Sequence, residues 1–170
     1  MSNRRDPSPA AQDDGGQDFH GFLARYRREH PDDVLVVEEP VSADQTATAL
    51  VEQLAAEGRH PMLVLECVEG GSAPFTAVTN VFASRERIAR LLGADGPGGI
   101  HAAYQARAKR RPGLETVGHG PVLENVTTAG MDLSTLPLLT HFASDRAPYI
   151  TNAIVVAEHP DTGVGNLSYH

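Results

Sequence analysis

The sequence predicts an α+β fold in which an α/β domain is followed by a region of short strands. Candidate strands and helices alternate between residues 18 and 112, which favours a sheet covered by helices. From residue 113 onward only short strand candidates remain, with no strong helix between them, as in a β-barrel or sandwich. The 170 residues are 41% hydrophobic but only 5% aromatic, so we expect a mainly aliphatic core.

The α/β domain begins with a tail, a helix and a strand. Residues 1–17 are rich in Ser, Pro, Asp, Gly and Gln, which predicts a disordered tail. Asp18 is a suitable N-cap for a helix that ends at residues 31–33. Apolar side chains recur at helical spacing on one face of this helix, at Phe19, Phe22, Leu23 and Tyr26. The β-branched run at residues 34–37 predicts the first strand.

A second helix and two further strands are expected next. Ser42 or Asp44 caps the helix, and Gly58 ends it. Its inner face carries Ala47, Leu50, Val51 and Leu54. Strands are predicted over residues 62–68 and 75–81, with a turn at residues 70–71 between them. Cys67 lies in the first of these apolar runs, so we expect a buried strand cysteine rather than a nucleophile.

Two more helices complete the domain. Ser84 caps the first of them, Gly93 ends it, and its inner face carries Ile88, Leu91 and Leu92. Residues 96–99 form a linker because they lack the Lys-Ser/Thr ending of a phosphate-binding loop. The last helix extends to about residue 111 and ends in a basic cluster, Arg107 with Lys109, Arg110 and Arg111. Cations are favoured at a helix C-terminus, so we interpret the cluster as structural, with an anion or RNA site as the alternative.

We place a domain boundary at residue 112. The chain then divides into a tail at residues 1–17, an α/β domain at residues 18–112 and a β region at residues 113–170. Strand candidates in the β region are residues 122–126, 136–139, 149–157 and 166 onward. The last strand candidate still shows the alternation of a strand at residue 170, so we expect the β region to be incomplete.

Charge and cysteine content restrict the partners and the compartment. The formal net charge of −8 disfavours nonspecific binding to nucleic acid or to an anionic membrane surface. The single cysteine cannot form an internal disulfide, which indicates a reducing, cytoplasmic compartment. No apolar run approaches the roughly 20 residues that cross a bilayer. The eight histidines are scattered and form no zinc-binding motif.

Asn166 is the most promising polar residue. It follows a turn built from Pro160, Asp161 and Gly163, and its amide oxygen suits Mg²⁺ or Mn²⁺. Strand alternation puts Asn166, Ser168 and His170 on one face, with Leu167 and Tyr169 on the other. Such a polar face either lines a ligand cavity or simply meets water.

Several ordered blocks resemble the UbiD family of decarboxylases. In the β region they are Leu136–His141, Asp145, Pro148–Thr151, Pro160–Gly163 and Asn166–Tyr169. Earlier agreeing segments are Phe22-Leu23, Val36–Val41 and Asn80–Arg87. The resemblance covers residues 18–170 and implies an N-terminal α/β domain followed by the first strands of a split β-barrel like that of flavin reductases.

The resemblance also implies an activity, cofactors and partners. The family reversibly decarboxylates aromatic or α,β-unsaturated carboxylic acids with prenylated FMN, and usually with Mn²⁺; K⁺ is a further candidate ion. A flavin prenyltransferase would supply the cofactor, and the full-length protein would form homo-oligomers. By resemblance Asn166 is a metal ligand, and Asn166, Ser168, Tyr169 and His170 line the cofactor.

No catalytic residue is assigned within these 170 residues. The family's arginine beside the cofactor would follow His170, and the family's glutamates lie farther on. We therefore expect the 170 residues alone to lack decarboxylase activity. Two alternatives stay open: a non-catalytic accessory or assembly subunit with a UbiD-like N-terminal domain, and a flavin-binding split-barrel oxidoreductase.

Overall fold

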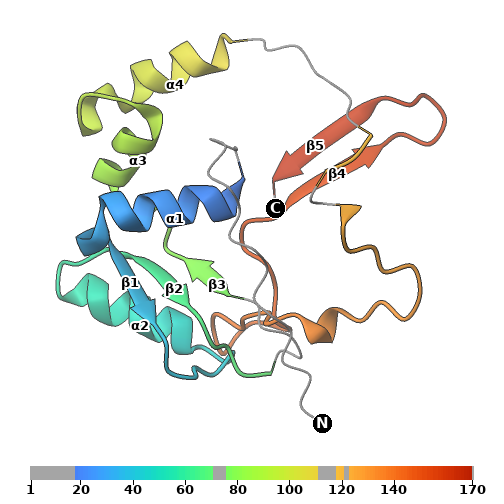
Figure 1. The fold of residues 1–170 in the computed structure, drawn as a ribbon, viewed down its shortest axis with the longest axis horizontal. Helices are drawn as coiled ribbons and strands as arrows, with labels where there is room; N and C mark the ends of the chain where they lie inside the picture. The colour runs from blue at the N-terminus through green and yellow to red at the C-terminus, as the bar shows by residue number, and fades with distance from the viewer. Residues whose placement is uncertain (1–17, 71–75, 111–117, 121–122, 170) are drawn as a thin grey trace.

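The structure is a computed structural model that describes residues 18–70, 76–110, 118–120 and 123–169. It contains a three-stranded sheet with helices against it, a pair of further helices, and a separate β-hairpin near the C-terminus (Figure 1). The predicted tail at residues 1–17 lies outside the described residues. The α+β class is confirmed, whereas the split barrel and the boundary at residue 112 stay predictions.

The first helix, α1 (Phe19–Glu29), begins and ends where the sequence predicts. The Asp18 carboxylate accepts a hydrogen bond of 2.7 Å from the backbone N–H of Gly21, as an N-cap does. Tyr26 is the buried residue of the apolar face, and Phe19 at its start is half exposed. The helix thus presents its second turn, rather than its first, to the core.

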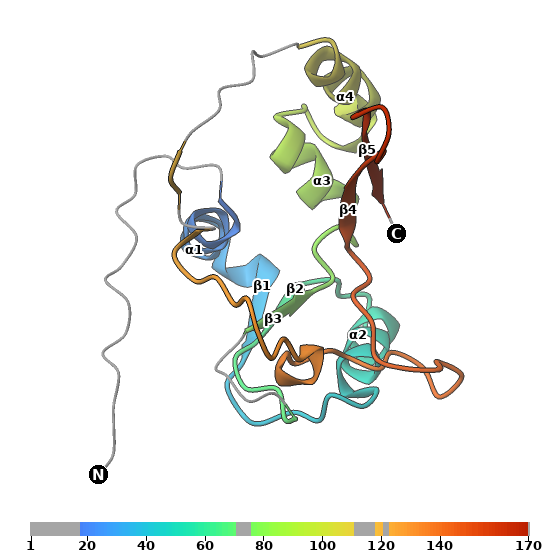
Figure 2. The ribbon, with the colours of Figure 1, turned by 90° about the vertical axis from the view of Figure 1, so that its right-hand side faces the viewer.

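The three-stranded sheet has the strand order β1-β2-β3. One pair of neighbouring strands is parallel and the other is antiparallel. Strand β1 (Val34–Val37) pairs parallel with β2 (Met62–Leu65), and β3 (Ala77–Thr79) pairs antiparallel with β2. All four side chains of β2 are buried, and alternate residues of a strand point to opposite faces, so both faces of the sheet are covered. Helix α1 lies on one side and α2 (Thr46–Ala56) on the other (Figure 2).

The core beneath α2 includes a residue from far along the chain. Its buried members are Val41, Ala47, Leu65 and Val68, and Leu139 packs against them. Thr140 then forms two backbone hydrogen bonds with the segment before α2: its N–H donates to Ala43 over 3.0 Å, and its carbonyl accepts from Gln45 over 2.8 Å. Residues near 140 are therefore packed against the α/β domain.

The predicted caps of α2 at Ser42 or Asp44 are wrong. The helix begins at Thr46 after Gln45, whose φ of +60° is left-handed and whose side chain makes no capping bond. The reason is tertiary, because the Gln45 N–H pairs with Thr140. The Ser42 hydroxyl instead accepts from the Asp44 N–H within a local turn. The predicted end is confirmed, since Gly58 adopts a φ of +72° just after the helix.

The two later strands of the sheet are shorter than predicted. Strand β2 stops at Leu65, and Cys67 is exposed, so the expectation of a buried strand cysteine is wrong. After β2 the chain bends so that Val68 enters the core while Cys67 points outward. Strand β3 ends at Thr79 because Asn80 takes a left-handed φ of +64°.

Two further helices, α3 (Arg85–Leu92) and α4 (Ile100–Ala108), follow the three-stranded sheet in the chain. Ser84 caps α3 and Gly93 ends it, as predicted. The predicted inner residues, Ile88, Leu91 and Leu92, are only partly buried, whereas Arg87 and Ala89 are fully buried. Residues 97–99 form a short 3₁₀ turn, and the Arg107 guanidinium donates to the Leu92 carbonyl, which supports a structural role for that arginine.

The predicted strands at residues 122–126 and 136–139 are wrong for the residues that the structure describes. Residues 123–125 form a turn, and a 3₁₀ turn occupies Leu133–Thr135. Residues 136–139 form no strand, since the Leu138 N–H donates to the Leu136 carbonyl over 2.8 Å and Pro137 has no N–H to contribute to a ladder. The next predicted strand begins only at Ile154, as β4 (Ile154–Glu158), and β5 (Gly165–Tyr169) follows it. In the described part of the chain, every helix is too short or too polar to span a membrane.

Candidate functional site

The residues predicted to hold the cofactor lie on β5, in the hairpin with β4. In this antiparallel pair Asn166 is opposite Ala157, and Ser168 is opposite Val155. Directly opposed residues of antiparallel strands project from the same face of the sheet. Asn166 and Ser168 therefore share one face with two modest apolar side chains, and on this face Asn166 is exposed whereas Ser168 is partly buried.

The other face of the hairpin is apolar. It carries Ile154 opposite Tyr169 and Val156 opposite Leu167. These four side chains are between 61% and 74% exposed. The alternation predicted from the sequence is thus confirmed for the described residues of β5, and it gives the hairpin one polar and one apolar face.

A tight turn sets which face Asn166 occupies. The His159 N–H donates to the Val164 carbonyl, and the Gly163 N–H donates to the His159 carbonyl, both over 3.0 Å. Gly163 has a φ of +66°, a conformation that side-chain-bearing residues rarely adopt. A shift of the strand register by one residue would move Asn166 to the apolar face. The turn is therefore what positions the predicted site.

The structure separates the four predicted site residues. Asn166 and Ser168 lie together, whereas Tyr169 lies on the opposite face, where its hydroxyl donates to the Thr151 carbonyl over 3.2 Å. His170 lies outside the described residues. The hydrogen bond of Tyr169 connects the hairpin to the segment before it, so this side chain has a structural contact as well as its proposed role.

The hairpin supplies one metal ligand of a suitable kind. The Asn166 amide oxygen is a hard donor that Mn²⁺ and Mg²⁺ accept. Among the residues that the structure describes, no three His, Cys, Asp or Glu side chains gather in a way that could hold a metal ion. A metal site at Asn166 therefore needs ligands from beyond the described residues.

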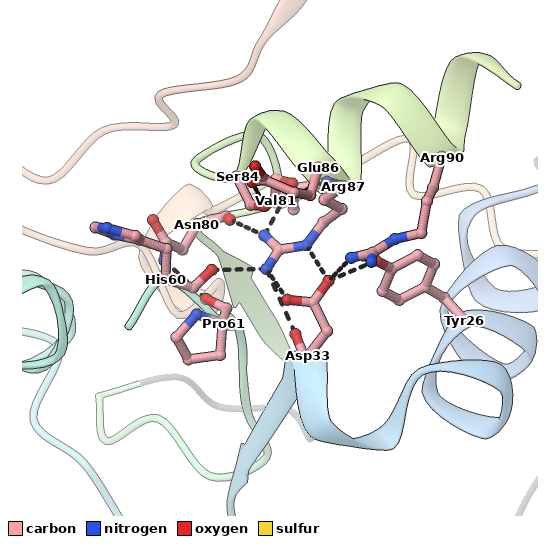
Figure 3. A network of polar contacts seen from close by, with 10 residues as sticks. All are labelled: Tyr26, Asp33, His60, Pro61, Asn80, Val81, Ser84, Glu86, Arg87 and Arg90. Carbon is pink, nitrogen blue, oxygen red and sulfur yellow. Dashed lines mark hydrogen bonds and ion pairs between the residues drawn. The ribbon is translucent and has the colours of Figure 1, made fainter. Parts of the chain in front are cut away.

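Sequence reasoning missed a buried ionic network between α3 and the start of β1 (Figure 3). The Arg87 guanidinium is completely buried and binds the Asp33 carboxylate through two atoms, Nε to Oδ2 over 3.0 Å and Nη2 to Oδ1 over 2.7 Å. The same guanidinium donates to the carbonyls of Asn80 and His60 over 2.7 and 2.6 Å. One side chain thus connects α3 to the segments that flank β1, β2 and β3.

Two further side chains converge on the same carboxylate. Arg90 Nη2 and the Tyr26 hydroxyl each donate to Asp33 Oδ2 over 2.6 Å. Burial acts to raise the pKa of Asp33, but hydrogen bonds from Arg87 and Tyr26 and the two arginine charges outweigh it, so the pKa lies below its usual range. Burial and the hydrogen bond to Asp33 raise the pKa of Tyr26. The network holds charged groups against one another, which is a scaffolding role.

No short sequence motif predicts this network. Asp33 and Arg87 are 54 positions apart, and an arginine among charged residues on a short helix is typical of a solvent-exposed face. Only the pairing of two distant segments makes burial of the guanidinium favourable.

Comparison with known proteins places the chain in a family. Residues 26–106 match the family model of the 3-octaprenyl-4-hydroxybenzoate carboxy-lyase N-terminal domain. Residues 115–170 match the model of the Rift-related domain of the same carboxy-lyase. The chain belongs to the UbiD family. The resemblance inferred from the sequence blocks is thereby confirmed.

UbiD-family relatives of known name include decarboxylases. Anhydromevalonate phosphate decarboxylase of Methanothermobacter thermautotrophicus is 30% identical over 82% of this chain and 30% of its own length. The enzyme of the same name from Methanosarcina mazei is 30% identical over 89% of this chain and 32% of its own length. The chain thus spans about a third of the length of these relatives.

Solved UbiD-class structures share the fold. An evolved dimeric form of HmfF from Pelotomaculum thermopropionicum, in complex with prFMN, superposes with a TM-score of 0.73 at 29% identity over 89% of this chain and 34% of its own. Vanillic acid decarboxylase of Sedimentibacter hydroxybenzoicus superposes with a TM-score of 0.76 at 25% identity over 91% of this chain and 35% of its own. The similarity extends across both the α/β domain and the hairpin.

Proposed function

We propose that this UbiD-family protein catalyses the reversible, non-oxidative decarboxylation of an aromatic or α,β-unsaturated carboxylic acid with prenylated FMN. The observation that carries the proposal is the likeness to HmfF, whose structure holds prFMN and superposes on most of this chain. Relatives are named for acids as different as anhydromevalonate phosphate and vanillic acid, so the likeness supports the reaction type more than any one substrate.

The polar face of the hairpin suits one side of a flavin site. Asn166 offers an amide and Ser168 a hydroxyl, while Val155 and Ala157 beside them are short side chains that leave room for a ligand. When bound, prenylated FMN supplies the electron sink for the carbon that loses CO₂. The task of this chain is to hold and orient that group, with Asn166 also contributing an oxygen ligand to Mn²⁺; K⁺ is a further candidate ion.

The proposal includes partners. A flavin prenyltransferase would supply the cofactor, and the protein would assemble with copies of itself. The exposed apolar face of the hairpin supports an assembled or longer state, because four adjacent apolar side chains this exposed are uncommon on a monomer.

The test uses the complete protein that contains these residues, because the 170 residues alone are expected to be inactive. It is co-expressed with a flavin prenyltransferase. Visible absorbance after gel filtration reports retained flavin, and CO₂ release is measured with panels of aromatic and α,β-unsaturated acids. Asn166→Ala and Ser168→Ala should each reduce retained flavin at least severalfold, whereas Asn125→Ala, an exposed asparagine outside the hairpin, should not.

Each outcome has a meaning. Flavin retention with CO₂ release supports the proposal. Flavin retention with redox turnover but no CO₂ release would favour a flavin oxidoreductase. Absence of both flavin and turnover would favour the accessory-subunit alternative and would overturn the proposal.

A further inference from the structure

Two pockets meet where the segment around residue 140 packs on the α/β domain. They have volumes of about 200 and 310 Å³. Their linings share four residues, Thr79, His141, Tyr149 and Thr151. We call the two together the junction pocket. Its described lining includes no residue of β4 or β5.

The walls of the junction pocket come from elements that are distant in sequence. One wall is formed by α2 and by the edge strand β3, whose outer edge carries no paired strand among the described residues. The opposite wall is formed by residues 136–139 and 149–152. In both views this later segment runs beside α2 and β3 (Figures 1 and 2).

Backbone hydrogen bonds hold the later wall in place. Besides the two bonds of Thr140, the Tyr149 N–H donates to the Leu139 carbonyl over 3.1 Å. Between these points the Asp145 carboxylate accepts from the N–H groups of His141 and Phe142, over 3.0 and 2.8 Å. These hydrogen bonds therefore fix the backbone of the later wall of the pocket.

An aromatic pair lines both halves of the pocket. The rings of His141 and Tyr149 meet edge to face, with centroids 5.2 Å apart and planes at 66°. Such a pair leaves a ring face and a ring edge available for a third ring, and each aromatic contact of this kind is favourable beyond the area that it buries.

The lining carries no full charge. Among the described residues around both halves, none is Asp, Glu, Lys or Arg. Polar groups are limited to hydroxyls, amides and one imidazole, as in Thr79, Thr151 and Asn152. In these half-open pockets a charged ligand would lose part of its hydration without gaining a counter-charge, which is unfavourable. An uncharged ligand with one hydrogen-bonding group would not meet that cost.

We propose that the junction pocket binds an uncharged, single-ring aromatic molecule that carries a hydrogen-bonding substituent. Its size agrees, since an apolar cavity of about 150 Å³ accepts a benzene ring. The ring would contact Tyr149 and His141, and the substituent would reach the hydroxyls of Thr79 and Thr151. This site does not depend on the proposed decarboxylation, whose acid substrates are anions.

The test compares two probes of matched shape, neutral benzamide and anionic benzoate. The full 170-residue chain is titrated with each and followed by ¹H–¹⁵N NMR, in buffer well above about pH 6.5, the ordinary midpoint for a histidine. For benzamide we expect a dissociation constant on the order of 1 mM, as suits a ligand of this size. Amide shifts should centre on Thr79, His141 and Thr151, and benzoate should bind at least tenfold more weakly.

Two variants test the location. Thr151→Phe places a ring in the pocket from an exposed position, and Tyr149→Ala removes the ring that the ligand would contact. Each should weaken benzamide binding at least tenfold. Tyr104→Ala is the matched control, because Tyr104 is also exposed, on α4, and lines neither half of the pocket.

Three results would overturn the proposal. They are equal binding of benzoate and benzamide, shifts that centre away from the junction pocket, and unchanged binding by Thr151→Phe with a native-like spectrum. Retained flavin and CO₂ release are measured separately, so failure of this site and failure of the proposed function are distinguishable.

Discussion

Replacing Arg87 with Met should destabilise the fold far more than the loss of any surface ion pair. The Arg87 side chain is fully buried, and its partner Asp33 is 23% exposed. Removing one member of a buried ion pair costs about 3–5 kcal/mol. The carbonyls of Asn80 and His60 also lose their donor, at about 1 kcal/mol each, while Asp33 keeps its bond from Arg90. Because Asp33 keeps this partner, the low end of the ion-pair range applies, about 3 kcal/mol, and with the two carbonyls we expect a total loss of about 5 kcal/mol.

The assay is urea unfolding followed by far-UV circular dichroism, which suits a chain without Trp. Arg27→Met is the matched control. Its partner is Glu66 at 3.6 Å, and both side chains are about half exposed, so the expected loss is below about 0.5 kcal/mol. Arg87→Lys keeps the positive charge but cannot bind Asp33 through two nitrogen atoms. Its loss of unfolding free energy should therefore lie between those of Arg27→Met and Arg87→Met, and it can still be measured if Arg87→Met does not fold.

A difference below about 1 kcal/mol between Arg87→Met and Arg27→Met would refute the reasoning. It would mean that the guanidinium contributes no more when buried and paired than at the surface. The same conclusion would follow if Arg87→Lys were as stable as the parent chain, because its ammonium cannot reproduce the fork on Asp33.

Two further predictions concern pH and the hairpin turn. Because the folded pKa of Asp33 lies below its ordinary value of 3.8, its ionised form stabilises the fold above that pH, and this contribution is lost as the pH falls through the folded pKa. The stability advantage of the parent chain over Asp33→Asn in urea unfolding should therefore shrink below about pH 4; an advantage that grows there would contradict the assignment. Gly163→Ala forces a side chain into a φ of +66°, with its Cβ 3.4 Å from Glu158 Oε1, and should cost about 1 kcal/mol. Amide hydrogen exchange in β4 and β5 should then quicken about fivefold, whereas Gly165→Ala, with open space around it, should leave exchange unchanged.

Local signals predicted the element ends well where the stabilising groups are neighbours in sequence. The Asp18 and Ser84 caps bond to N–H groups three positions later, and Gly93 ends α3 because its own backbone tolerates a left-handed φ. The faces of β5 followed from alternation alone, with Asn166 and Ser168 on one side. These features need no information about distant segments.

Predictions from local sequence signals were wrong where a segment distant in sequence forms the decisive contacts. The predicted cap at Ser42 or Asp44 lost to a backbone pairing between Gln45 and Thr140. Cys67 sits in an apolar run, yet it is exposed: the chain bends after Leu65, and Val68, which pairs with Val41, enters the core instead. The apolar stretch at residues 136–139 packs on the core through Leu139 without joining a strand ladder.

The sequence by itself determined the order and type of the helices, the hairpin turn and the polar face with Asn166, because each rests on backbone sterics and hydrogen bonds within a few residues. The tertiary structure alone decided the burial of Arg87 against Asp33 and the walls of the junction pocket. Both depend on contacts between segments tens of residues apart, such as those that bring His141 and Thr79 into the lining of one pocket. The free energy of such contacts comes from desolvation and packing that exist only after the segments have come together.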